Sequence, residues 1–152
     1  MIAIENVASA GDRQLWFGQV KSSAELRTPL QDAAFLALIF VADQSMSSND
    51  RAEIASVLIS SGCRYAVCAG SGCDAWHDAI DVAALGTDPP RTAKDVMTAS
   101  LPNESLEDLV EFFLQTATFE GFQPNYLVLQ VGETPQLKAE LLTIVKARFL
   151  RG

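Results

Sequence analysis

Four apolar segments, each followed by a stretch of helical periodicity, constrain the fold of this chain more than any other feature. They lie at residues 35–41, 65–69, 96–100 and 126–131. The first is nearly continuous in apolar side chains, which is typical of a strand buried on both faces. Because strands that alternate with helices are joined by right-handed crossovers, the pattern predicts a parallel sheet covered by helices on both faces.

The helical stretches begin and end at recognisable residues. Ser47 precedes Asp50, and Ser105 precedes Asp108, at the spacing of a capping box. Gly62 supplies a stop signal after the first helical stretch. We therefore expect an α/β fold: a three-layer sandwich of about four parallel strands with helices on both faces, flavodoxin-like or Rossmann-like in strand order.

The first 30 residues fit this alternation less well. Residues 2–7 and 15–20 have strand character and are separated by a polar turn, which favours an N-terminal hairpin or an antiparallel edge strand. No linker divides the remainder, and 152 residues suit one domain. We expect a single α/β domain over residues 1–152, with a less regular extension at 1–30.

Neither a membrane segment nor an export signal is evident in the sequence. The longest apolar run, residues 33–42, is about half of the roughly 20 residues that a membrane helix needs. The N-terminus lacks the basic start and apolar stretch of a signal peptide. The cysteines Cys63, Cys68 and Cys73 are odd in number, which favours free thiols over a disulfide framework. We therefore expect a cytoplasmic protein.

Negative charge is concentrated in the middle of the chain. The net charge is −8, and residues 31–121 carry 14 acidic side chains against 4 basic ones. Nucleic acid and anionic membranes both attract basic surfaces, so neither is an expected partner. Such charge ordinarily serves solubility. Its more specific use is to steer a basic protein partner toward the chain.

In a parallel sheet of this kind, the residues that follow the strands meet at one edge, where ligands usually bind. Almost none of the residues expected there is basic. They are Asp43, Gln44, Ser45, the segment 70–74, Ser100, Pro102, Asn103, Glu104, Gly132, Glu133 and Thr134. Those that we predict to contact a ligand are Asp43, Gly70, Ser71, Gly72, Asp74, Glu104 and Glu133.

The turn Gly70-Ser71-Gly72 between a strand and a helix has two interpretations. Its backbone amides are able to present donors to a nucleotide or phosphate at a helix start. The pattern is neither a P-loop nor a dinucleotide fingerprint, since Ala75 stands where the fingerprint needs glycine. The simpler interpretation is a tight turn that uses the conformational freedom of glycine.

Cys73, His77 and Asp81 are spaced four residues apart and therefore share one face of a helix. A cysteine at a helix start beside a histidine suits a nucleophile and its base, with the aspartate orienting the imidazole. The simpler interpretation is that the cysteine packs as a small apolar residue while the histidine pairs with the aspartate. Two ligands fall short of a closed zinc site, so we expect no metal and no cofactor.

Acidic side chains recur at helical spacing on two successive helices. On the first they include Asp78, and on the second they follow residue 105. A solvated face is the ordinary interpretation, and a docking face for a basic partner is the functional one. The residues predicted to bind such a partner are Asp78, Glu107, Asp108 and Glu111.

The segments 64–68 and 73–81 resemble a family of uncharacterised small bacterial α/β proteins. In that family a strand ending in cysteine leads into a Cys-x-x-x-His-Asp helix, as in Cys73-Asp74-Ala75-Trp76-His77-Asp78 here. Residues 96–99 and 104–108 are similar to its next strand and helix. The likeness covers roughly residues 35–118. It implies a bacterial origin and an α/β sandwich, and it implies no activity.

We therefore expect a non-catalytic, acidic bacterial protein that binds another protein, as an immunity-type inhibitor, an adaptor or a component of a defence or regulatory complex. One alternative is a small cysteine-dependent enzyme that uses Cys73 and His77. The other is a nucleotide- or phosphate-binding module at residues 70–72. The oligomeric state is not indicated by the sequence.

Overall fold

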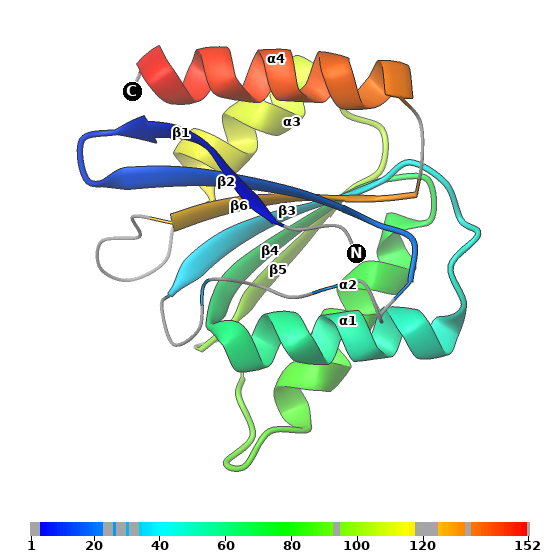
Figure 1. The fold of residues 1–152 in the computed structure, drawn as a ribbon. Helices are drawn as coiled ribbons and strands as arrows, with labels where there is room; N and C mark the ends of the chain where they lie inside the picture. Colours follow the sequence, from blue (N-terminus) through cyan, green and yellow to red (C-terminus); the bar gives the residue numbers. More distant parts are fainter. Residues whose placement is uncertain are drawn as a thin grey trace.

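Six strands form one sheet in the computed structural model, which describes residues 4–22, 26, 30, 34–92, 95–117, 125–132 and 135–151 (Figure 1). The strands are β1 (Glu5–Ala10), β2 (Arg13–Val20), β3 (Phe35–Val41), β4 (Cys63–Gly70), β5 (Met97–Leu101) and β6 (Asn125–Val131). The helices are α1 (Ser48–Ser61), α2 (Cys73–Leu85), α3 (Leu106–Glu111), its π-helical continuation η2 (Phe112–Thr116), and α4 (Pro135–Arg151).

The sheet is parallel except at one edge. Its order is β1-β2-β6-β3-β4-β5, and β1 pairs antiparallel with β2 while the other neighbours pair parallel. This arrangement confirms the α/β sandwich. The N-terminal hairpin is present as β1 and β2. One feature of the sheet was not expected from the sequence. Strand β2 also pairs with β6 in a seven-residue parallel ladder and is therefore a fifth parallel strand.

The four strands that the sequence predicts lie in the order β5-β4-β3-β6, which is the 3-2-1-4 order of a Rossmann-like sheet and not the flavodoxin-like order. From β3 to β4 to β5 the chain advances one strand at a time through α1 and α2. It then returns past β4 and β3, and β6 enters the sheet between β3 and β2. Apolar periodicity shows that a crossover exists, but it does not show how many strands the crossover spans.

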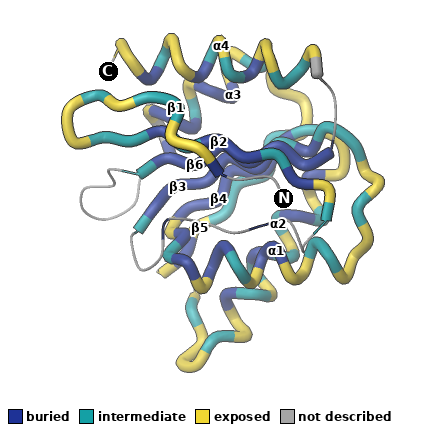
Figure 2. The backbone as a smooth tube through the Cα atoms, in the orientation of Figure 1, coloured by how far each residue is buried: buried dark blue, intermediate teal, exposed yellow. Residues whose placement is uncertain are grey.

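The helices cover the sheet from both sides. In Figure 1, α1 and α2 lie below the sheet, whereas α3 and α4 lie above it. Each side has its own core: Ile54 and Ile80 belong to the first, and Phe113 and Phe149 to the second. Figure 2 shows that the central strands are buried and that β1 is largely exposed. Of the helices in the described segments, none combines the length and apolar composition needed to cross a bilayer.

Helix caps form where the sequence indicates them. The Ser47 and Ser105 side chains accept hydrogen bonds from the backbone amides of Asp50 and Asp108, at 3.1 and 3.2 Å. Each bond satisfies one of the amides that a helix start leaves without a partner. Gly62 ends α1 in the left-handed conformation, with φ of 115°.

Close backbone contacts fix the carboxyl edge of the sheet. Gly70 has φ of +89°, and a Cβ atom built on it would lie 2.4 Å from the carbonyl oxygen of Val41. The end of β4 therefore approaches the end of β3 more closely than any side chain allows. Gly11, in the β1–β2 turn, also has positive φ (+62°), but no atom lies within 4 Å of its Cβ position.

We expect Gly70→Ala to lower the free energy of unfolding by roughly 2–4 kcal/mol, because it adds a steric clash to left-handed strain. Gly11→Ala introduces only the strain, so its loss is about 1 kcal/mol. Gly86→Ala is the control without either effect, since φ of Gly86 is −81° and a Cβ atom built on it would lie 3.4 Å from the carbonyl oxygen of Val82, an ordinary contact distance. Urea unfolding followed by circular dichroism measures all three. Equal losses for Gly70→Ala and Gly11→Ala would contradict the close approach of β4 to β3.

Candidate functional site

The topological switch point of the sheet lies between β3 and β6. The chain leaves β3 toward α1 on one face and leaves β6 toward α4 on the other, so the two connections diverge beyond the strand ends. Asp43 lies at this point. Its Oδ1 accepts hydrogen bonds from the backbone amide and the hydroxyl of Ser45, at 3.0 and 2.5 Å. A Cβ on Gly132 would meet the Asp43 carboxylate at 2.3 Å, so glycine there makes room for the acid.

The Gly70-Ser71-Gly72 turn lies beside this point and is packed by Gln44. The Gln44 Nε2 atom donates to Ser71 Oγ at 2.5 Å. A Cβ on Gly72, whose φ is +74°, would lie 2.9 Å from the Gln44 amide. The turn therefore has the tight geometry that glycine permits, with the Gln44 side chain against it.

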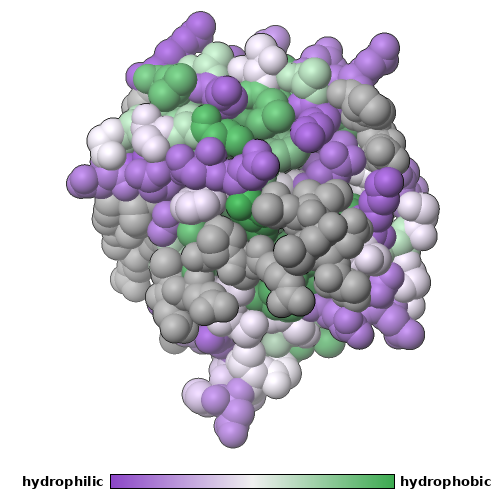
Figure 3. Space-filling view, viewed as in Figure 1, coloured by the Kyte–Doolittle hydropathy of each residue, from purple (hydrophilic) through white to green (hydrophobic). Residues whose placement is uncertain are grey.

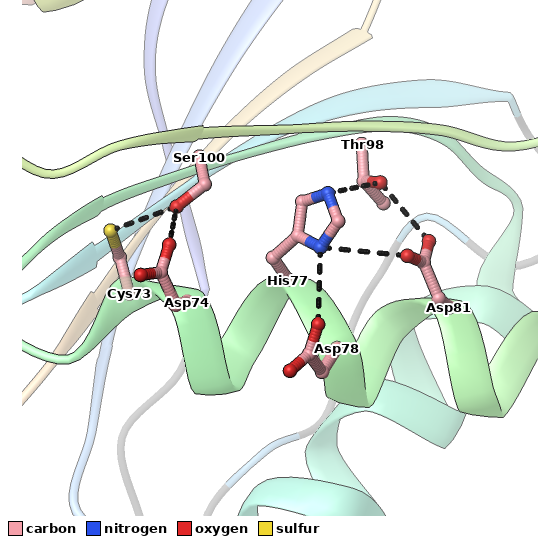
Figure 4. A network of polar contacts seen from close by, with 7 residues as sticks. All are labelled: Cys73, Asp74, His77, Asp78, Asp81, Thr98 and Ser100. Carbon is pink, nitrogen blue, oxygen red and sulfur yellow. Dashed lines mark hydrogen bonds and ion pairs between the residues drawn. The ribbon is translucent and has the colours of Figure 1, made fainter.

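The other predicted ligand residues are more scattered. Asp74 points along α2 toward β5, where it binds Ser100 (Figure 4). Glu104 is exposed in the connection between β5 and α3. Glu133 lies outside the described residues.

Cys73 is bonded to β5 and not to His77. The Cys73 Sγ atom is 3.3 Å from Ser100 Oγ, and Ser100 Oγ donates its proton to Asp74. The thiol is therefore the donor to Ser100. The Cys73 residue is 1% exposed and belongs to the core below the sheet. No hydrogen bond joins Cys73 to His77, both of which are described.

His77 forms a second, separate network with the same strand (Figure 4). Its Nε2 is 3.0 Å from Thr98 Oγ1, which donates to Asp81 Oδ1 at 3.0 Å. The Thr98 hydroxyl has one proton and donates it to Asp81, so the Thr98 oxygen accepts a hydrogen bond from the Nε2–H group of His77. The His77 Nδ1 atom faces Asp81 Oδ2 and Asp78 Oδ1, each at 3.5 Å. The imidazole is thus held between α2 and β5 by two acids and a hydroxyl.

These contacts agree with the simpler interpretation of the Cys73, His77 and Asp81 pattern, in which the cysteine packs and the histidine pairs with the aspartate. The sequence reasoning did not single out Thr98, which joins His77 to Asp81. The strand periodicity could have indicated this role. Thr98 and Ser100 are two residues apart, so their side chains point to the same face of β5.

The two other thiols are unsuited to chemistry. Burial raises the pKa of Cys63 to about 12, although a backbone hydrogen bond with Tyr65 partly opposes the rise. Burial also raises the pKa of Cys68, and nearby negative groups raise it further. In the part of the chain that the structure describes, no group of three or more His, Cys, Asp or Glu side chains is arranged to hold a metal ion.

The predicted partner-binding acids do not form one surface. Asp78 is on α2 below the sheet, whereas Glu107, Asp108 and Glu111 are on α3 above it. The reason is the return crossover from β5 to β6: a right-handed connection that runs backward must cross the opposite face. Glu111 also lies 3.8 Å from Arg148 of α4.

Exposed apolar side chains gather instead around α2 and the start of β5. Val82, Leu85 and Met97 are 69%, 59% and 41% exposed. With Asp78 and Asp81 they make up what we name the α2–β5 surface. A cleft of about 370 Å³ lies on its α1 side and includes Val82, and one of about 340 Å³ lies on its β5 side and includes Leu85 and Met97. The view in Figure 3 shows a different face, where hydrophobic groups are visible mainly between α4 and the β1–β2 hairpin.

One comparison with known proteins gives a match. The model of a family described as "Domain of unknown function (DUF7684)" matches residues 15–148, which is most of the chain. Neither the curated proteins nor the solved structures contain a match.

We expect none of the three thiols to react with Ellman's reagent in the folded protein, because Cys63, Cys68 and Cys73 are all buried. All three should react after unfolding in urea. A Cys73 that reacts in the native protein as fast as free cysteine would contradict its placement, and would favour the cysteine-enzyme alternative.

We also expect the free energy of unfolding to fall as the pH rises above about 9. Unfolded thiols lose their protons near pH 8.5, roughly, whereas the buried thiol of Cys63 keeps its proton until about pH 12. Unfolding therefore releases protons in this window, and alkaline solution favours it. Urea unfolding at about pH 7.5, below this window, and at about pH 9.5 and 10.5, within it, measures how steeply the free energy of unfolding falls with pH. The fall should be less steep in the Cys63→Ala/Cys68→Ala variant. An identical slope in that variant would contradict the burial of these thiols.

Proposed function

We propose that this chain, which belongs to the DUF7684 family, works by binding another protein through the α2–β5 surface. The observation that carries the proposal is the exposure of Val82 and Leu85 on α2 and of Met97 at the start of β5, next to the two clefts that these residues line. Single exposed apolar residues are ordinary, but a group of them with polar surroundings and adjoining clefts is typical of an interaction site. Aliphatic anchors inside a charged rim are the usual composition of a protein interface.

The charge of the surface favours a basic partner. The Asp78 and Asp81 side chains are 81% and 47% exposed, and the chain as a whole has a net charge of −8. Carboxylates at the rim of an interface raise the rate of encounter with a basic protein and disfavour acidic ones. The proposal thus keeps the setting expected from the sequence, a bacterial protein of the cytoplasm that serves as an inhibitor, an adaptor or part of a complex.

The alternatives have less support. A cysteine-dependent enzyme needs an accessible thiolate beside a base, whereas Cys73 is 1% exposed and bonds Ser100. A phosphate site at residues 70–72 needs space above the turn, and the Gln44 side chain packs there.

We expect the double variant Val82→Asp/Leu85→Asp to lose a partner that the unchanged chain retains when it is purified from its cell of origin. Replacing two apolar anchors by charges should weaken binding at least tenfold, or by about 1.4 kcal/mol. Both side chains are exposed, so the stability of the fold should change by less than about 0.5 kcal/mol per substitution.

Leu150→Asp is the matched control. Leu150 is 58% exposed on α4, on the other side of the sheet. The control should retain the same partner at the same stoichiometry. Recovery of no stoichiometric protein, or equal loss in the control and the double variant, would contradict binding through the α2–β5 surface.

A further inference from the structure

The two edges of the sheet differ in how they are protected. At one edge, β1 is interrupted by a bulge between Asn6 and Ala8 and carries a charge at Glu5. At the other edge, β5 has the sequence Met-Thr-Ala-Ser-Leu and pairs with β4 without a break in register. Bulges and charges are the usual means by which an edge strand avoids pairing with another chain. Apart from its shortness, β5 has neither.

The outer side of β5 has no partner strand among the described elements. Its backbone donors and acceptors on that side are therefore able to receive an extended segment, which is a known way for sheets to bind peptides. The cleft of about 340 Å³ begins at this strand, and Leu85, Val96 and Met97 are among its lining residues. An apolar side chain of a bound segment fits such a cleft, while its backbone pairs with β5.

Among the residues that the structure describes, the charged side chains around this edge are mainly acidic. From α2, the Asp74 and Asp81 side chains reach β5, where they accept hydrogen bonds from Ser100 and Thr98, whereas Asp78 points away from the strand (Figure 4). Of the described residues that line the cleft, Arg91 is the one with a positive charge, and its Nη1 atom donates to the Ile59 carbonyl, 2.7 Å away near the end of α1. Thr98 and His77 hold Asp81 at the rim of the cleft.

Resting on the proposed function, we infer that the partner supplies an extended basic segment that pairs with the free edge of β5 and adds a seventh strand to the sheet. Its lysine or arginine side chains meet the carboxylates of α2, and an aliphatic side chain enters the cleft beside Leu85 and Met97. A second copy of this chain is the disfavoured occupant, because it would bring like carboxylates of two α2 helices together.

The test uses a library of randomised twelve-residue peptides displayed on phage and selected on the whole chain. We expect enrichment of peptides in which lysine or arginine alternates with aliphatic residues. A synthetic peptide of this kind should slow amide hydrogen exchange of β5 at least tenfold. N-methylation of alternate residues along one edge of the peptide should abolish binding, while methylation along the other edge should not.

Two matched substitutions test the charge contacts. Asp81→Asn should weaken peptide binding at least threefold, because it removes the charge of a carboxylate that lines the β5 cleft, while the amide oxygen of asparagine is still able to accept from Thr98. Glu107→Gln removes an exposed carboxylate from α3 on the other side of the sheet and should have no effect. Equal effects of the two substitutions would overturn the assignment of the basic side chains to α2.

The outcomes separate this inference from the proposed function. Binding that Leu85→Asp abolishes, with no slowed exchange in β5 and no effect of N-methylation, overturns strand addition and leaves the α2–β5 surface as the binding site. Enriched peptides that bind Leu85→Asp unchanged contradict both. A selection that enriches no peptide, or a chain that elutes as a dimer whose β5 amides are already protected, overturns the basic segment as the occupant.

Discussion

Right-handed crossovers decide which surfaces of this protein are available for binding. The chain advances from β3 to β5 with α1 and α2 on one face, and the return to β6 is then forced onto the opposite face. The return leaves β5 at the end of the sheet, with α2 beside it as its main helical neighbour. The grouping of exposed apolar side chains, the two clefts and the free strand edge all follow from that arrangement.

The polar residues between α2 and β5 mainly hold the helix in place against the strand. Thr98 and Ser100 are the residues of β5 that meet α2, and each is bonded to an acid of that helix. Hydrogen bonds to charged groups are stronger than those between neutral groups. The histidine and cysteine that look catalytic in the sequence are thereby used to fix the helix against the edge strand, which leaves Asp78 facing solvent.

Local patterns of the sequence predict the elements well, and they predict distant contacts poorly. The run at residues 35–41 and the caps at Ser47 and Ser105 correspond to β3, α1 and α3, because apolar period and capping are properties of neighbouring residues. The place of β6 between β2 and β3 depends on packing across the whole chain, and so does the separation of Asp78 from Glu107. The pairing of Cys73 with Ser100 is likewise a contact across 27 residues.

The central claim is that the α2–β5 surface contacts another protein inside the cell. The most direct measurement replaces Leu85, and in a second variant Leu150, with the photo-crosslinking residue p-benzoylphenylalanine and irradiates living cells that produce the chain. The account predicts one adduct of defined mass from position 85 and none from position 150. Absence of an adduct at position 85, or the same adduct from both positions, would contradict it.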